Sequence, residues 1–256
     1  MQPEERFVRD VLDGDGFETE RIDEDPREKR ADFRARHGGE VYLIEVKRSE
    51  ETLTLPGPNE VAHWEIPLGY RNAVAGVTRD ASRQLASTPV TQGDPLRVLW
   101  FVTTGVEADA HAEQVRATLY GAVDLIWRFQ DGGAKAKCCY FFTFAEFFRR
   151  PELDAAVVGT SRHAQFCVNS FGRRVELVRQ CKLYRLFESG VVDPHEEEAR
   201  GTAFMADFPG NRRDEAAMLE GVKQKYKLDF LIPFKPTKYT ATAWVGSGEP
   251  GDHEPR

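Results

Sequence analysis

The sequence predicts an α/β protein in which helices cover a mixed central sheet, with an α+β elaboration in the C-terminal half. Three observations predict this class. Along residues 1–132, apolar runs of strand length alternate with segments of helical periodicity. The longest apolar runs are rich in β-branched residues, which is typical of strands buried on both faces. A glycine pair at 38–39 is a hairpin signal between two of the predicted strands.

The elements of the first half follow in order along the chain. The apolar stripes of residues at helical spacing predict helices at 4–13, 70–87 and 109–120. Apolar or alternating runs predict strands at 17–22, 31–37, 41–47, 96–104 and 122–129. Asp109 is the expected N-cap of the third helix, and the proline-containing residues 49–68 are expected to form a loop.

The second half, residues 133–245, is predicted to be an α+β extension that serves in DNA binding or in oligomerisation. Thr143 and Glu146 fit a capping box that starts a short helix, and Pro151 ends it. Residues 172–190 are expected to form an amphipathic helix or a passage from a strand to a helix. A further helix is expected at 214–228, and an extended segment at 229–245. Residues 246–256 are expected to form a disordered tail.

Composition and charge exclude some classes of protein. The chain of 256 residues is long enough to bury a sizeable core, and it carries a net charge of −7. No apolar run is long enough to span a membrane, and the charged N-terminus lacks a secretion signal, so a cytoplasmic location is expected. The four cysteines match no zinc or redox spacing. The total charge supplies no basic footprint for nucleic acid, so binding would depend on local charge.

The strand at 41–47 ends in charged residues that a core strand would not need. Side chains alternate between the two faces of a strand, so Leu43, Glu45 and Lys47 share one face. The turn at 38–39 brings the preceding strand alongside, and Asp32 at its start can approach Glu45 in an antiparallel pair. The sequence leaves the register of that pair open.

Two neighbouring carboxylates repel each other unless a positive charge neutralises them. A hard divalent cation with oxygen ligands does this, so Asp32 and Glu45 predict a Mg²⁺ site, with Mn²⁺ as a substitute. Lys47 could stabilise charge that builds on a phosphate. The alternative without a function is a solvated ion pair between Glu45 and Lys47, which contributes little to the stability of the fold.

The pattern of a helix with Glu4 and Glu5, then Asp32, then Glu45-Val46-Lys47 resembles the PD-(D/E)XK nuclease superfamily, which includes type II restriction endonucleases. The resemblance covers about residues 1–130 and implies a restriction-endonuclease-like mixed sheet flanked by helices. It also implies that Asp32 and Glu45 bind Mg²⁺ and that Lys47 assists catalysis. An acidic residue of the first helix, Glu5 or else Glu4, would join the metal site through water.

The family's helix after this strand often contributes a polar residue, for which Gln84 is the candidate and Arg83 the alternative. Two features depart from the family. Ala31 stands where the motif has proline, and Thr88 stands where one branch has tyrosine after the glutamine. The long segment 49–68 between the strand and the helix is a third departure.

The sequence therefore predicts a Mg²⁺-dependent deoxyribonuclease, an endonuclease of DNA processing or defence, with Asp32, Glu45, Lys47, Gln84 and Glu5 at its site. DNA is the expected partner, with RNA, a homodimer and a partner protein left open. One alternative is a non-catalytic nucleic-acid-binding or scaffold protein that retains the nuclease fold. Another is a protein whose interactions are made by residues 134–245, with the core as a support.

Basic and aromatic residues of the second half are the candidates for nucleic-acid contacts, with solvated helix faces as the alternative. The candidates for phosphate contacts include Arg173, Arg174, Arg179, Lys182 and Arg185. The candidates for stacking on bases are Tyr226 and Tyr239.

Overall fold

The computed structural model describes most of the chain. The described residues are 1–23, 29–49, 61–66, 69–90, 93–105, 107–128, 133–160, 162–234 and 239–244, with the backbone alone for 61–66 and 239–244. The predicted tail at 246–256 and most of the predicted loop at 49–68 lie outside these residues. Within that loop, residues 61–66 form a strand.

The helices alternate with strands through much of the chain. The helical segments are α1 (Pro3–Gly14), α2 (Asn72–Ser87), α3 (Ala108–Tyr120), α4 (Glu146–Arg149), α5 (Val175–Gln180), α6 (Lys182–Leu186), η1 (Glu188–Gly190), α7 (Pro194–Ala199) and α8 (Glu215–Tyr226). The strands of the largest sheet are β1 (Glu18–Arg21), β2 (Phe33–His37), β3 (Glu40–Ser49), β5 (Leu96–Thr103), β8 (Ala155–Gly159), β9 (Ala164–Val168) and β10 (Val191–Val192). The remaining strands are β4 (Val61–Ile66), β6 (Val123–Arg128), β7 (Ala134–Tyr140), β11 (Phe204–Met205), β12 (Leu231–Phe234) and β13 (Tyr239–Trp244).

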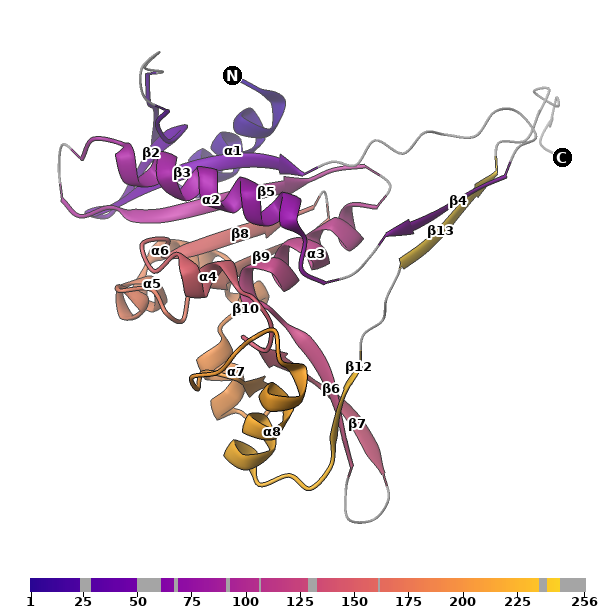
Figure 1. The fold of residues 1–256 in the computed structure, drawn as a ribbon. Coiled ribbons are helices and arrows are strands. Elements are labelled where there is room, and N and C mark those ends of the chain that lie inside the picture. Colours follow the sequence, from indigo (N-terminus) through magenta and orange to yellow (C-terminus); the bar gives the residue numbers. More distant parts are fainter. Residues whose placement is uncertain are drawn as a thin grey trace, which may run out of the picture.

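The seven-stranded sheet is mixed and has the order β1-β2-β3-β5-β8-β9-β10 (Figure 1). An antiparallel meander, β1-β2-β3, forms one side, and β3, β5 and β8 run parallel through the middle. β9 runs antiparallel to β8, and β10 runs parallel to β9. Because β3, β5 and β8 are parallel, their carboxyl ends meet at one edge of the sheet.

Each face of this sheet is covered by its own helices. Val8 and Leu12 of α1 pack with Ile44 and Val46 on one face, where α5 and α6 also contribute. The helices α2, α3 and α4 cover the other face, and Leu43 packs there. The strand β3 is thus buried on both faces, and polar residues begin on the α2 face only at Glu45, beyond Leu43.

A second, four-stranded sheet has the order β11-β7-β6-β12 and lies beside α8 at the bottom of Figure 1. Its core includes Leu125, Phe142, Met218 and Val222. β4 and β13 form a separate two-stranded antiparallel ribbon from segments far apart in the sequence. Figure 1 shows this ribbon extending away from the large sheet.

The structure confirms the predicted α/β class and the mixed sheet flanked by helices. The expected helices at 4–13, 70–87, 109–120 and 214–228 are present, as are the strands at 17–22, 31–37, 41–47 and 96–104. The strand predicted at 122–129 is present as β6, but it is less buried than expected. Leu125 is its one buried residue, because β6 lies in the smaller sheet, which buries one face only.

Three details of the helices differ from the prediction. The N-cap of α3 is Glu107, and Asp109 lies in the first turn instead. The N-cap of α4 is Ala145, so Thr143 does not begin that helix. The helix expected at 172–190 is broken at Cys181, whose extended backbone (φ −73°, ψ 161°) separates α5 from α6.

The predicted boundary at residue 132 falls between β6 and β7, which pair with each other. β8, β9 and β10 follow this boundary yet complete the seven-stranded sheet that β5 belongs to. The described residues therefore do not separate into a core and an extension at this point. The five-residue runs of β8 and β9 were missed because short apolar runs carry little periodicity.

Candidate active site

Backbone hydrogen bonds place Asp32 opposite Glu45. The Asp32 N–H donates to the Ile44 carbonyl oxygen at 3.1 Å, and β2 continues with Phe33 paired to Ile44. The Val46 N–H donates to Oδ2 of Asp32 at 2.7 Å, and this hydrogen bond holds the carboxylate against the backbone of β3. This is the register that the sequence left open, and it brings the two carboxyl groups together.

Glu45 and Lys47 lie side by side on the face of β3 that α2 covers. The Lys47 ammonium donates a hydrogen bond to Oε1 of Glu45. The Glu45 side chain is completely buried, and its Oε2 receives no hydrogen bond from a described donor, while the Asp32 carboxyl group lies close enough to share a proton with Glu45. A buried charged oxygen without a partner costs free energy, so we expect this oxygen either to carry a proton or to bind a ligand.

The electrostatics of the site favour a proton on Glu45 when no cation is bound. Burial raises the pKa of Glu45 to about 8, and the neighbouring Asp32 charge acts in the same direction against the lowering effect of Lys47. Burial also raises the pKa of Asp32, while the Val46 N–H and Lys47 lower it. Two buried carboxyl groups in contact therefore hold their protons more tightly than exposed ones do.

Glu5 lies near this pair but is already engaged. Its Oε2 accepts a hydrogen bond from the Gln2 N–H at 3.0 Å, as in a capping box at the start of α1. The Arg21 guanidinium lies 3.8 Å from the same oxygen. The charge of Glu5 is close enough to raise the pKa of Asp32. Of the two candidate acids, Glu4 and Glu5, Glu5 therefore interacts with the candidate site through its charge.

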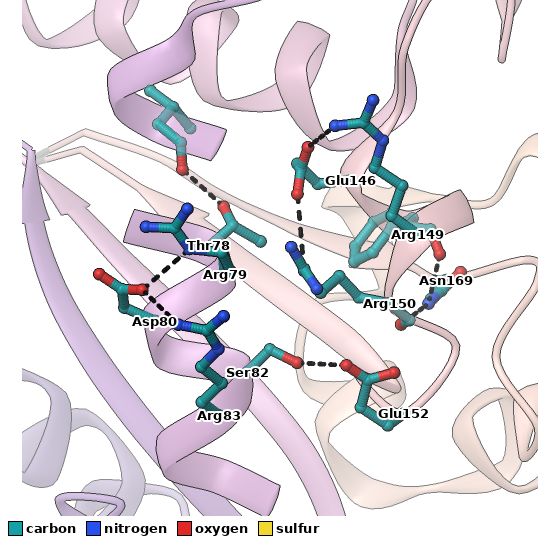
Figure 2. Close-up of polar contacts among 12 residues, drawn as sticks. Thr78, Arg79, Asp80, Ser82, Arg83, Glu146, Arg149, Arg150, Glu152 and Asn169 are labelled. Carbon is teal, nitrogen blue, oxygen red and sulfur yellow. Dashed lines mark hydrogen bonds and ion pairs between the residues drawn. The ribbon is translucent and has the colours of Figure 1, made fainter. Parts of the chain in front are cut away.

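The structure directs Gln84 elsewhere. Its side-chain NH₂ donates to the carbonyl oxygen of Arg30 at 3.4 Å, beside the chain that leads into Asp32. Arg83, the alternative, is exposed and pairs with Asp80 at 3.7 Å, as Figure 2 shows. Neither side chain has a described contact with Glu45 or Lys47.

Thr88 is a residue at this site that sequence reasoning missed. Its hydroxyl accepts the Ala31 N–H at 2.7 Å and donates to the Gln84 carbonyl oxygen at 2.7 Å. It therefore ties the end of α2 to the residue before Asp32. A threonine just after a helix gives no signal of this role, because the contact joins segments 57 residues apart.

The donor set can be compared with the needs of a metal ion. Among the residues that the structure describes, no group of three or more His, Cys, Asp or Glu side chains is placed to hold one. Mg²⁺, however, is often bound by one or two carboxylates, with water and substrate phosphate as its other ligands. Asp32 and the unpartnered Oε2 of Glu45 fit that requirement, with Glu5 near them.

The basic residues predicted to contact phosphates are partly committed to the fold. Arg174 pairs with the buried Asp154, and Arg179 pairs with the buried Asp193 at 2.7 Å. The Tyr226 hydroxyl donates to Glu198, and the side chain of Tyr239 lies outside the described residues. Arg174 and Arg179 therefore stabilise the fold instead of facing a ligand.

Comparisons with known proteins identify no relative. No family model, no curated protein and no solved structure matches the chain. The likeness to the PD-(D/E)XK superfamily therefore depends on the motif residues alone. No helix in the described part of the chain has the length and apolar character needed to cross a membrane.

Proposed function

We propose that the protein is a Mg²⁺-dependent nuclease with a restriction-endonuclease-like core that hydrolyses phosphodiester bonds of DNA. One observation carries the proposal: the buried Oε2 of Glu45 has no partner among the described residues and lies beside Asp32 and Lys47. A carboxylate pair with a lysine at the edge of a sheet is the chemistry that metal-assisted phosphodiester hydrolysis requires.

Asp32 and Glu45 are the residues that would hold Mg²⁺. The bound ion would polarise a phosphoryl oxygen and lower the pKa of a water molecule. The Val46 N–H orients Asp32, and the Thr88 hydroxyl holds the backbone just before it. Glu45 must lose its proton to act as a ligand, which its raised pKa opposes below about pH 8.

Lys47 has two roles in this proposal. In the absence of substrate it pairs with Oε1 of Glu45 and compensates part of the buried charge. With a phosphodiester present, its partly exposed ammonium group can reach toward the phosphate and stabilise the charge that builds in the transition state.

A second candidate is a non-catalytic nucleic-acid-binding or scaffold protein that keeps the fold. Two observations favour it. Lys47 already satisfies one oxygen of Glu45, and Glu5, the third acid expected at the site, is engaged by the Gln2 N–H and lies 3.8 Å from Arg21. In this candidate the Glu45–Lys47 pair is a structural ion pair and binds no metal.

Cleavage assays separate the two candidates. Purified protein is incubated with supercoiled plasmid, linear duplex, single-stranded DNA and RNA, each with Mg²⁺, Mn²⁺ or EDTA. The proposed nuclease cleaves DNA with either metal and not with EDTA, and Glu45→Gln and Lys47→Ala abolish the cleavage. The matched control is Glu18→Gln, an exposed glutamate of β1, which should cleave normally. Cleavage that survives in Glu45→Gln and Lys47→Ala would rule out the assigned site.

A further inference from the structure

Two arginines near α4 have no ion pair among the described residues. The Arg212 guanidinium donates to the carbonyl oxygens of Ala206 and Phe208, at 2.7 and 3.0 Å, and contacts the Met218 sulfur. Burial lowers the pKa of Arg212, while the charge of Asp207 acts in the opposite direction. The side chain of Arg213 is exposed and likewise forms no ion pair with a described residue.

The nearby acidic groups are engaged elsewhere. The Asp214 side chain caps α8 by accepting the Ala217 N–H at 3.0 Å. Asp207 pairs with Lys225 at 2.7 Å. Glu146 is shared between Arg149 and Arg150, as Figure 2 shows, so this group also carries an excess positive charge.

The guanidinium groups lie over phenylalanine rings. Arg149 and Arg213 lie 4.8 and 5.7 Å from the centroid of Phe144. Arg212 lies 5.9 Å from the centroid of Phe148 and 5.7 Å from that of Phe208. Phe148 is 53% exposed although it is a large apolar side chain. We call this group the arginine–phenylalanine patch; its members are Phe144, Phe148, Phe208, Arg149, Arg212 and Arg213.

The surface at the patch has two hollows. A small hollow is lined by Phe144, Phe148, Arg149 and Arg212. An open groove of about 570 Å³ runs from Phe208 along α8 to Lys225. A groove of this size is within the range that accommodates small ligands.

We propose that the arginine–phenylalanine patch binds unpaired nucleotides of a single-stranded nucleic acid. Exposed aromatic rings can stack on bases, and arginines can pair with the phosphates between them. In a duplex the base faces are covered by their neighbours, so rings such as Phe148 favour a strand whose bases are free. The inference rests on the proposed function and deepens it, because it names a substrate class that contains unpaired nucleotides.

Charge favours nucleic acid over a protein partner at this patch. Arginine and phenylalanine are also common in protein interfaces, where buried arginines find acidic partners. Here Arg149, Arg212 and Arg213 gather around the phenylalanine rings, and two of the nearby acids, Asp207 and Glu146, are already paired with cations, which suits a chain of phosphates. A protein partner is the alternative outcome of the test below.

α2 lies next to both the candidate active site and α4, the helix that carries Phe148 and Arg149 of the patch. The Ser82 hydroxyl of α2 donates to Glu152 at 2.7 Å, next to the end of α4, as seen in Figure 2. Thr88, just after α2, holds Ala31 beside Asp32. A strand on the patch would therefore lie on the same face of the large sheet as Glu45 and Lys47.

The test is fluorescence anisotropy with a labelled 20-nucleotide oligothymidylate and a blunt duplex of equal length, both in EDTA so that no cleavage occurs. The intact protein should bind the single strand at least tenfold more tightly than the duplex. Phe148→Ala should weaken that binding about tenfold through lost stacking. Arg213→Ala should weaken binding as well. It should also reduce the slope of log affinity against log salt concentration by about 1, as expected for the loss of one phosphate contact. Both side chains are exposed, and thermal melting verifies that the variants fold.

The matched control is Arg6→Ala. Arg6 is exposed and has no ion pair among the described residues, and it lies on α1, which covers the opposite face of the large sheet. Its loss should leave binding unchanged. Equal weakening in Arg6→Ala, preference for the duplex, or no oligonucleotide binding would overturn the inference, and the last result would point to a protein partner.

The two proposals can fail separately. Metal-dependent cleavage without binding in EDTA would overturn the inference and leave the nuclease proposal standing. Binding in EDTA that Phe148→Ala weakens, without cleavage in any metal, would support the inference and remove the nuclease proposal.

Discussion

Asp154 and Glu45 are two buried carboxylates of the large sheet with opposite environments. Asp154 precedes β8, and its oxygens accept hydrogen bonds from Arg174 and from the Arg97 N–H at 2.7 Å. Glu45 has Lys47 on one oxygen and no described partner on the other. Both have a raised pKa because of burial. The comparison teaches that burial alone does not mark a site: Asp154 is satisfied by the fold, whereas Glu45 is left incomplete.

The largest expected effect is on the satisfied carboxylate. Arg174→Ala leaves Asp154 buried without its cation and should lower the free energy of unfolding by about 3–5 kcal/mol. Urea denaturation measures this loss. The control is Arg173→Ala, an exposed neighbour, which should change stability by less than about 0.5 kcal/mol. If both variants lost the same free energy of unfolding, the ion pair of Arg174 would not be what stabilises the buried Asp154, and the contrast with Glu45 would be removed.

Glu45→Gln should abolish activity without lowering stability, which is the opposite of the effect expected for Arg174→Ala. Cleavage of plasmid in Mg²⁺ should fall at least about 100-fold, because removal of a group that stabilises transition-state charge has effects of this size. The metal-free variant should nevertheless be as stable as the intact protein at pH 5 and more stable at pH 8.

The sign follows from the pKa. The folded-state pKa of Glu45, about 8, lies above its ordinary value of 4.5, so the folded protein binds more protons between these pH values. The contribution of Glu45 to stability is therefore present below about pH 4.5 and is lost as the pH rises through about 8. Glutamine does not titrate, so thermal melting at both pH values checks the prediction. A variant that is less stable than the intact protein at pH 8 would contradict it.

Thr88→Val should have an intermediate effect. It removes the acceptor of the buried Ala31 N–H and should lower the free energy of unfolding by about 2 kcal/mol. Because Ala31 precedes Asp32, cleavage should fall as well, and Thr88→Ser should restore both. Recovery of stability without recovery of cleavage in Thr88→Ser would show that Thr88 does not position Asp32.

The smallest expected effect is the pH dependence of metal binding. Mg²⁺ competes with the proton on Glu45, so apparent affinity should be at least about tenfold higher at pH 8.5 than at pH 6. At non-saturating metal this adds up to about 1 kcal/mol of extra stabilisation at the higher pH. Melting curves with and without Mg²⁺ measure it, and Glu45→Gln should show no such gain. Equal stabilisation at the two pH values would mean that Glu45 is not a ligand.

The local pattern of the first half predicted its elements apart from β4, which lies in the segment expected to be a loop. The alternation along 41–47 predicted which side chains share a face, and the glycine pair at 38–39 predicted the hairpin that β2 and β3 form. The prediction was weaker after residue 132, where β8 and β9 are short and carry no clear period. Strand pairing between distant segments, such as β5 with β8, decides what those residues become.

The sequence by itself determined the α/β class, the strand that carries Glu45 and Lys47, and the candidate position of Asp32, because these depend on local periodicity and short-range turns. The tertiary structure decided the rest. The register brought Asp32 to Glu45, Thr88 reached Ala31 across 57 residues, and Arg174 and Arg179 were used in ion pairs. These outcomes depend on which distant groups meet and on how far water is excluded, and neither is encoded in the spacing of a single segment.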